Sequence, residues 1–385
     1  MNSKRIPFNK PFFIGKELEY IYEAIHSNSN ISGNGPFTNK CHRWLENNLD
    51  VKKALLTHSC TGALEMTAIL ADIQPGDEII MPSFTFVSTA NAFVLRGGVP
   101  VFVDIRPDTL NINEIKIEAA ITKKTKAIVP VHYAGIACEM DTIMNIAKKY
   151  NLLVIEDAAH AILSEYKGKR LGSIGHLGCL SFHETKNINS GEGGALLIND
   201  QRLIERSEVI WEKGTDRQKY FRGEIDKYTW TDIGSSYLPS DITAAFLYAQ
   251  LLHAEEITEK RVNNFQTYYN LLKPLEGDGL IQLPYIPNHC KHNGHLFYII
   301  AKTHKEQQKL IKYLNQNGIS AIFHYIPLHS ASAGKKYAKI IRNLTITENF
   351  SSKLIRLPNY YELTNENCQY IVQKIYDYFN KKLKA

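Results

Sequence analysis

The stretch Leu152-Leu153-Val154-Ile155-Glu156-Asp157-Ala158-Ala159-His160 decides the fold. Its apolar residues follow one another without polar interruption, a pattern typical of a parallel strand that is covered on both faces. Two acids and a histidine come after the apolar run, at the edge where open α/β sheets bind their ligands. Asp157 is therefore a candidate site residue, although a helix cap or a surface acid is the more ordinary role for such a residue taken alone.

Similar apolar runs, separated by amphipathic stretches, occur on both sides of this strand. The expected strands are residues 54–57, 78–81, 100–104, 127–131, 152–156, 177–182 and 195–198. The expected helices between them are residues 62–71, 86–95 and 140–150. Strands that alternate with helices predict a three-layer α/β domain around a mainly parallel sheet.

The pattern changes after residue 240. A stretch with helical periodicity continues to about residue 272, and a turn-rich segment with Pro284 and Pro287 and then shorter candidate strands and helices follow it. We therefore expect two tightly packed domains, a large α/β domain at residues 1–249 and a smaller α+β domain at residues 250–385.

The composition excludes several classes of protein. With 44% hydrophobic and 22% charged residues, the chain is typical of globular proteins, and no apolar run approaches the roughly 18 residues of a membrane helix. The net charge of +6 arises from basic residues spread along the chain, unlike those of a nucleic-acid binder. The N-terminal stretch has no apolar segment typical of a signal peptide, so we expect a cytoplasmic protein. The six cysteines have no zinc spacing, and we expect reduced thiols with neither a disulfide framework nor a metal site.

Two further segments carry candidate chemistry. Ser181-Phe182-His183-Glu184-Thr185-Lys186-Asn187 begins at a strand end and continues into a glycine-containing loop, where Lys186 can lie in a cleft at the sheet edge. Ser59-Cys60-Thr61-Gly62 joins a strand to a helix, and its backbone N–H groups form a potential phosphate site. A loop lysine is usually solvated and small residues often cap ordinary helices. Together with Asp157, however, they match the groups that a pyridoxal-phosphate (PLP) enzyme needs.

These segments and several others also resemble those of a known family. The chain is similar along almost its whole length to the DegT/DnrJ/EryC1/StrS sugar aminotransferases, which have the fold type I architecture of PLP-dependent enzymes. The segments that carry the resemblance are residues 6–8, 31–37, 82–87, 156–160 and 327–329. Segments 181–187, 212–230 and 232–238 more narrowly resemble those of members that make dTDP-4-amino-4,6-dideoxygalactose for enterobacterial common antigen.

The resemblance implies roles for individual residues. It implies that Lys186 forms the Schiff base, that Asp157 pairs with the pyridine nitrogen, and that Phe86 stacks on the cofactor ring, where plain core packing is the alternative. The residues matching the phosphate cup are Thr61, Gly62 and Ser181.

Two positions depart from the pattern of most members. His160 stands where many have glutamine beside the phenolic oxygen of the cofactor. Ser236 stands where most have an asparagine that reaches the phosphate from the partner subunit, and a serine is shorter.

Candidate substrate contacts lie later in the chain. Lys213, Arg217 and Arg222 could meet the nucleotide diphosphate or the donor carboxylate, or could form a solvated basic face. A further set that the family places near the site consists of His324, Tyr325 and His329, for which structural roles are the alternative.

The expected function is therefore transfer of the amino group of L-glutamate to the 4-keto carbon of dTDP-4-keto-6-deoxyglucose by a homodimer with shared sites. A 3-keto sugar aminotransferase and a PLP-dependent sugar dehydratase are alternatives within the family. The dehydratases carry histidine at the position of Lys186, which disfavours them. A non-catalytic PLP or nucleotide-sugar sensor is the alternative from another class.

Overall fold

The computed structural model describes residues 5–27 and 31–383. Residues 1–4, at the start of the stretch considered for a signal peptide, and residues 28–30 and 384–385 lie outside the described part.

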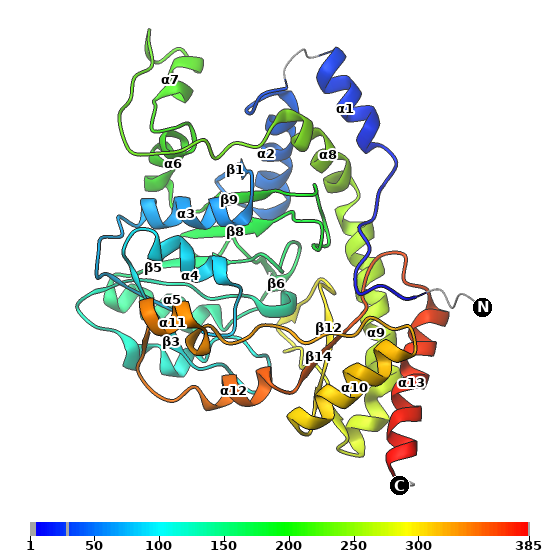
Figure 1. Cartoon of the computed structure of the whole chain (residues 1–385). Coiled ribbons are helices and arrows are strands. Elements are labelled where there is room, and N and C mark those ends of the chain that lie inside the picture. The colour runs from blue at the N-terminus through cyan, green and yellow to red at the C-terminus, as the bar shows by residue number, and fades with distance from the viewer. Residues whose placement is uncertain (1–4, 28–30, 384–385) are drawn as a thin grey trace.

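An eight-stranded sheet forms the centre of the larger part of the molecule, in the order β1-β9-β8-β5-β4-β2-β3-β13 (Figure 1). Its strands are β1 (Lys53–Thr57), β2 (Glu78–Pro82), β3 (Val99–Val103), β4 (Thr125–Ile128), β5 (Leu153–Asp157), β8 (Leu177–Ser181), β9 (Gly194–Ile198) and β13 (Lys339–Ile340). Strand β9 is antiparallel to both neighbours, and the other pairs are parallel. The expected mainly parallel sheet is confirmed.

Helices cover both faces of this sheet, as the uninterrupted apolar runs require. In β5, Val154 belongs to one buried cluster and Ile155 to another, because successive side chains point to opposite faces of a strand. The helices of the first face are α1 (Glu17–His26), α2 (Pro36–Leu49), α5 (Met140–Tyr150) and α8 (Asp241–Leu252). Those of the second face are α3 (Cys60–Leu70), α4 (Val87–Val94) and α6 (Ile204–Trp211). The three-layer α/β architecture follows.

For the same reason, the side chains of Glu156 and Asp157, the last two residues of β5, point to opposite faces of the strand. Glu156 is fully buried and accepts hydrogen bonds from the N–H groups of Gly172 (2.8 Å), Ile174 (2.8 Å) and Gly175 (2.5 Å). Its Oε2 also lies 2.8 Å from Nε2 of His132. Glu156 therefore fixes the loop before β8, while Asp157 faces the other side of the strand.

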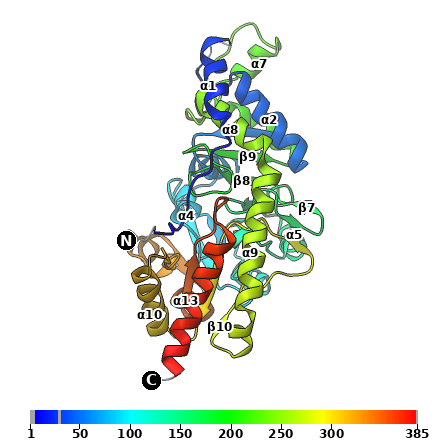
Figure 2. The same cartoon turned by 90° about the vertical axis from the view of Figure 1, so that its right-hand side faces the viewer.

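A second, smaller body follows α9 (Ala254–Gly277), the long helix that runs down from the large sheet (Figures 1 and 2). Its antiparallel sheet contains β10 (Ile281–Gln282), β12 (Phe297–Ala301) and β14 (Leu354–Leu357), and the helices α10 (His304–Gln316) and α13 (Asn365–Leu383) pack against it. This body has its own apolar core, which also includes Ile6.

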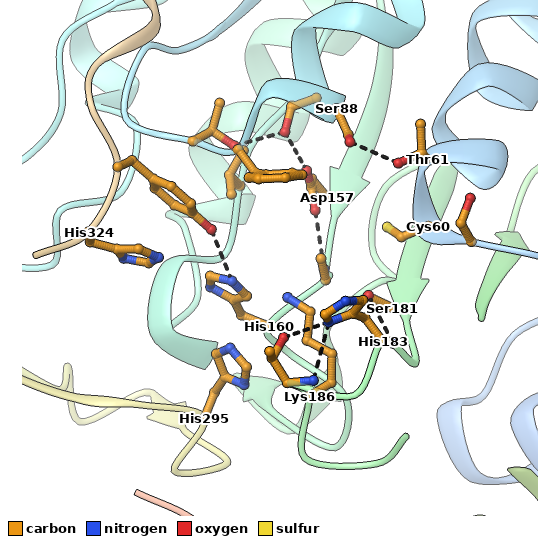
Figure 3. Close-up of a pocket in the computed structure, with 18 of the residues that line it drawn as sticks. Cys60, Thr61, Ser88, Asp157, His160, Ser181, His183, Lys186, His295 and His324 are labelled. Carbon is orange, nitrogen blue, oxygen red and sulfur yellow. Dashed lines mark hydrogen bonds between the residues drawn. The ribbon is translucent and has the colours of Figure 1, made fainter. Parts of the chain in front are cut away.

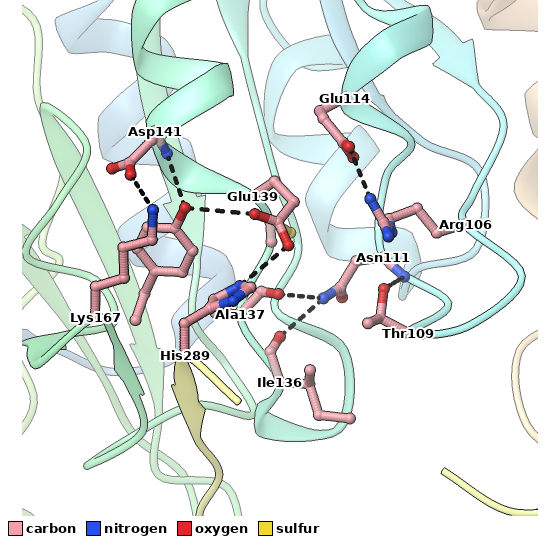
Figure 4. Close-up of polar contacts among 12 residues, drawn as sticks. Arg106, Thr109, Asn111, Glu114, Ile136, Ala137, Glu139, Asp141, Lys167 and His289 are labelled. Atoms are coloured by element: carbon pink, nitrogen blue, oxygen red, sulfur yellow. Dashed lines mark hydrogen bonds and ion pairs between the residues drawn. The ribbon is translucent and has the colours of Figure 1, made fainter. Parts of the chain in front are cut away.

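The two bodies exchange short segments. Strand β13 joins the large sheet beside β3, and β11 (Cys290–Lys291) pairs with β6 (Glu165–Tyr166). His289, next to β11, lies 3.1 Å from the Glu139 carboxylate of the large body (Figure 4). Within the large body, Asn111 donates to the carbonyls of Ile136 and Ala137 beside this contact. We propose a boundary between the two domains at residues 249/250. Strands β11 and β13 lie after this boundary in the sequence but pair with strands of the large body.

The remaining elements are short. They are β7 (Lys169–Arg170), α7 (Arg217–Phe221), α11 (Ser332–Tyr337), α12 (Thr345–Ser351), η1 (Glu114–Lys116), η2 (Glu118–Ala120), η3 (Tyr133–Gly135), η4 (Gln201–Leu203) and η5 (Leu328–Ser330). Among the helices of the described residues, none is long and apolar enough to cross a membrane.

Candidate active site

A cavity of about 690 Å³ opens at the carboxyl ends of β5 and β8, beside the N-terminus of α3. The predicted site residues that line it are Thr61, Phe86, Asp157, His160, Ser181, Lys186, His324 and Tyr325. Parallel strands end at one edge of a sheet, and this edge brings the three predicted segments together. Figure 3 shows that they surround one space.

Lys186 points into this space from the loop after β8 (Figure 3). Its backbone N–H donates to the carbonyl of His183 at 2.9 Å, and Nζ has no hydrogen-bond partner among the described residues. Burial lowers the pKa of Lys186 to about 8, although the nearby Cys60 and Asp157 oppose this shift. Roughly one chain in ten then carries a neutral amine at pH 7, far more than for a solvated lysine. The amine is therefore prepared to act as a nucleophile.

Asp157 ends β5 with a nearly buried carboxylate. Its Oδ2 accepts a hydrogen bond of 2.7 Å from the hydroxyl of Thr89, and its Oδ1 accepts one of 3.2 Å from the N–H of Ala159. Thr89 in turn shares a hydrogen bond of 2.8 Å with Thr85. The carboxylate is thus oriented by groups on both sides, with its charge in the cavity wall.

The N-terminus of α3 offers a seat for an anion. Ser59 caps the helix, because its Oγ accepts from the N–H of Gly62 at 3.0 Å. The N–H groups of Cys60 and Thr61 have no acceptor within the described chain. Free N–H groups at the positive end of a helix bind phosphate, and the hydroxyls of Thr61 and Ser181 line the same end of the cavity.

Gly62 lies just behind this seat and does not line the cavity. A Cβ atom there would come within 3.0 Å of the His58 ring. We therefore infer that Gly62 is needed for space between the helix and that ring.

Histidine and tyrosine rings line the side of the cavity opposite the N-terminus of α3 (Figure 3). His160 stacks on His295 with ring centroids 4.2 Å apart, and its Nδ1 accepts from the N–H of Ala134 at 3.4 Å. The proton of this ring therefore belongs on Nε2, which lies 3.2 Å from the Tyr325 hydroxyl. Burial lowers the pKa of His160, His295 and His324 well below the ordinary value, so all three imidazoles stay neutral.

Phe86 has the exposure that a stacking residue needs. Its ring is 58% exposed and lines the cavity at the start of α4, so that the alternative of plain core packing does not describe its position. A flat aromatic ring could lie against it.

Other predicted residues lie away from this cavity. Ser236 is exposed, and its backbone forms an isolated β-bridge with that of Glu212. The three basic residues form ion pairs with buried acids of the same chain: Lys213 and Arg217 with Glu212, and Arg222 with Glu208. 

His329 is buried outside the cavity. Its Nδ1 lies 2.7 Å from Oγ of Ser83 and its Nε2 lies 3.2 Å from Glu348. These contacts fasten the turn at η5 to the end of β2, which is a structural role.

The structure adds lining residues that sequence reasoning did not find. They include Phe8, Ser88, Thr89, His295, Phe323 and Arg356. Ser59 and Cys60, in the segment that predicts a phosphate site, also line the cavity. No local pattern distinguishes Phe8, His295 or Arg356, which reach the cavity from the N-terminal segment and the small body.

PLP-dependent enzymes need an amine to hold an aldehyde, an anion beside a pyridine nitrogen and a seat for a phosphate. This cavity offers all three, so fold and site together define an enzyme of that class. The chain belongs to the DegT/DnrJ/EryC1/StrS aminotransferase family, whose sequence profile matches residues 14–376.

Individual relatives support this placement. The GDP-perosamine synthase of Escherichia coli O157:H7 is 31% identical over 383 residues, which cover 98% of this chain and 100% of the relative. The aminotransferase from Psychrobacter cryohalolentis superposes with a TM-score of 0.91 at 27% identity, covering 97% of this chain and 99% of that one. S. venezuelae DesV, solved in complex with a ketimine intermediate, has a TM-score of 0.88 at 26% identity, with 98% and 99% covered.

The protein is thus a PLP-dependent sugar aminotransferase, whose substrates are a sugar nucleotide and an amino donor. When bound, PLP supplies an aldehyde that exchanges with amines and a ring that takes up electrons. The buried Lys186 amine, the Asp157 carboxylate and the free N–H groups of Cys60 and Thr61 fit its aldehyde, ring nitrogen and phosphate in chemical type.

Proposed function

We propose that this protein transfers the amino group of L-glutamate to the 4-keto carbon of dTDP-4-keto-6-deoxyglucose, as a dTDP-4-amino-4,6-dideoxygalactose transaminase. Its product then enters a cell-surface polysaccharide of the enterobacterial common antigen type. The observation that carries the proposal is the convergence of Lys186, Asp157 and the N-terminus of α3 on one cavity. The similarity of segments 181–187, 212–230 and 232–238 to enzymes of that activity supports the choice of sugar.

In this proposal five side chains besides Lys186 hold PLP. Asp157 stabilises the proton on the pyridine nitrogen, because a buried anion raises the pKa of a neighbouring base. Phe86 covers one face of the ring, and Thr61 and Ser181 bind the phosphate from the positive end of α3. His160 donates from Nε2 toward the phenolic oxygen, in competition with the Tyr325 hydroxyl that it meets at 3.2 Å.

Lys186 then moves protons. Once the donor amine has displaced it, Nζ removes the proton from the α-carbon of the donor. In the second half of the reaction it delivers a proton to the sugar carbon that receives the nitrogen. A pKa of about 8 suits both tasks, since a base with a pKa near the working pH can accept and release a proton.

We further propose a homodimer with shared sites. Segment 214–237 projects from the large body and contains α7 (Figure 1). Four of its aromatic side chains are exposed, those of Tyr220, Phe221, Tyr228 and Trp230, the last by 80%. Exposed aromatic and arginine side chains are enriched at buried contacts between chains. Since Lys213, Arg217 and Arg222 do not line the cavity of their own chain, any contact they make with substrate phosphates would be in the site of the partner.

We place this activity in the cytoplasm. All six cysteines are free, as expected for a reducing compartment.

A product assay tests the proposal. Holoenzyme is incubated with glutamate and a panel of keto-sugar nucleotides that differ in base (dTDP, UDP, GDP) and in the keto position (C-3 or C-4), with mass spectrometry and NMR of the product. We expect an amino group at C-4 of the dTDP sugar in the galacto configuration. Amination at C-3, deoxygenation without amination, or preference for a UDP or GDP sugar would contradict the proposed substrate.

A further inference from the structure

Arg356 lines the cavity, and its guanidinium forms no ion pair with the described residues. It lies on β14, where its backbone is fixed by reciprocal hydrogen bonds of 2.7 and 3.2 Å with Ile322. Its Nε–H is buried and has no acceptor, and neither Nη atom forms a hydrogen bond or ion pair with the described chain. An uncompensated charge in a protein interior is costly. A guanidinium retained at this position therefore indicates an anion that the chain itself does not provide.

Other arginines of the chain differ from it. Arg106 and Arg170 pair with carboxylates, and the buried Arg261 donates to the carbonyl of His295 at 2.7 Å. Arg96 also has a buried Nε without an acceptor, but it lies outside the cavity. Arg96 is therefore a matched control for Arg356.

The N-terminal strap, residues 5–9, holds the guanidinium in place. The centroid of the Phe8 ring lies 4.4 Å from the Arg356 guanidinium carbon. Ile6 is hydrogen-bonded to Gly318 (2.8 Å) and Ser320 (3.0 Å) of the small body, and Asn9 donates to the carbonyl of Glu184 at 3.3 Å, in the loop that bears Lys186. A ring against one face of a guanidinium leaves the N–H edges free for a carboxylate in the same plane.

We infer that Arg356 binds the α-carboxylate of the amino donor, and that Phe8 is the positioning residue for its guanidinium. The inference rests on the proposed function only in requiring an α-amino acid as donor. In such a donor the carboxylate and the reacting amine share one carbon atom, so the carboxylate must bind close to Lys186. The diphosphate of a sugar nucleotide is separated from its keto carbon by the sugar ring. Arg356 and Lys186 line the same cavity, and the strap that holds the guanidinium also contacts the loop that bears Lys186. This arrangement favours the nearer of the two anions, and the charge of Arg356 also lowers the pKa of the Lys186 amine.

The two half-reactions test this inference separately. Holoenzyme in the PLP form is mixed with glutamate alone, and the aminated form with the sugar nucleotide alone, each followed by absorbance. In Arg356→Gln we expect the half-saturating glutamate concentration to rise about 30- to 1000-fold, as for a truncated buried charge pair. The sugar half-reaction should change less than threefold, and Arg96→Gln should resemble the wild type in both.

The α-amide of glutamate identifies the carboxylate. The wild type should prefer glutamate over this amide. Arg356→Gln should lose the preference, because the guanidinium that distinguishes a carboxylate from an amide is then absent with either ligand. Phe8→Leu should weaken glutamate binding with little change in kcat, and Phe8→Tyr should restore it. Calorimetric binding of glutarate to the holoenzyme gives a readout without turnover, and should weaken at least tenfold in Arg356→Gln but not in Arg96→Gln.

Three outcomes would overturn the inference. Loss confined to the sugar half-reaction would assign Arg356 to the diphosphate, equal loss in both halves would assign it to cofactor placement or folding, and no loss would leave it without a ligand role. If Arg356→Gln does not fold, Arg356→Lys, which keeps the charge, takes its place. We then expect a loss of glutamate binding in the same half-reaction. The donor half-reaction needs no sugar nucleotide, so a wrong choice of sugar substrate does not affect it.

Discussion

The hydroxyl of Thr89 donates a hydrogen bond of 2.7 Å to Oδ2 of Asp157, from α4 to the end of β5. This contact fixes the direction in which the carboxylate faces the cavity. Asp157→Asn keeps the size but removes the charge, and we expect transamination to fall by about 100-fold or more with a change in unfolding free energy of roughly 1 kcal/mol. Steady-state kinetics and thermal melting check this, and near-normal turnover would reduce Asp157 to a structural acid.

Thr89→Val tests the orientation separately from the charge. A hydrogen bond to a charged group contributes about 1.5–3 kcal/mol, so we expect kcat to fall by about tenfold or more. Thr85 bonds to Thr89 rather than to Asp157, and Thr85→Val should therefore have the smaller effect. The reverse order of the two variants would contradict the assigned contact.

The pKa of about 8 at Lys186 predicts how cofactor capture depends on pH. Only the neutral amine attacks an aldehyde, so the rate at which apoprotein captures PLP should rise about tenfold per pH unit below pH 8 and level off above it. Stopped-flow absorbance between pH 6 and 10 measures this profile. A midpoint near the ordinary lysine value would show that burial does not depress the pKa.

The anion seat at α3 predicts selectivity for the phosphate of the cofactor. Thr61→Val combined with Ser181→Ala should weaken PLP binding by about 100-fold, because two hydrogen bonds to a charged group are removed. Binding of pyridoxal, which has no phosphate, should be unaffected, and Ser190→Ala, outside the cavity, is the control. Equal losses for both cofactors would place the phosphate elsewhere.

Mixed dimers test whether the site is shared. One chain carries Lys186→Ala, and the other carries Arg222→Ala with Ser236→Trp in segment 214–237. If each site combines Lys186 of one chain with this segment of the other, half of the dimers regain one intact site, giving about one quarter of wild-type activity. No recovery after verified subunit exchange, or full activity in a monomer, would show that each chain builds its own site.

Much of the fold could be predicted from local pattern. The apolar runs that became β1 to β5, β8 and β9 are long enough to show burial on both faces, and glycines mark the ends of several helices. Strand β13 has no such signal, because Lys339 and Ile340 are exposed and pair with β3 only through the tertiary structure.

The candidate site likewise contains residues that local sequence pattern indicates and residues that only the tertiary structure brings to it. Asp157, Lys186 and Thr61 lie at strand or helix ends within segments whose pattern indicates a site. Arg356 lies inside a short strand of the other body, and its unpaired state is a property of the packed structure, invisible in the sequence. Conversely, local sequence could not show that Arg222 is paired with Glu208 or that His329 is fastened to Ser83.

Reduction with borohydride tests the central claim most directly, since it fixes PLP to the amine that holds it. Holoenzyme is reduced, digested and analysed by mass spectrometry, with Lys186→Ala in parallel. We predict the adduct on Lys186 alone, and in the variant no adduct although PLP still binds through the seat at α3. An adduct on another lysine, or none in wild-type protein supplied with PLP, would contradict the account.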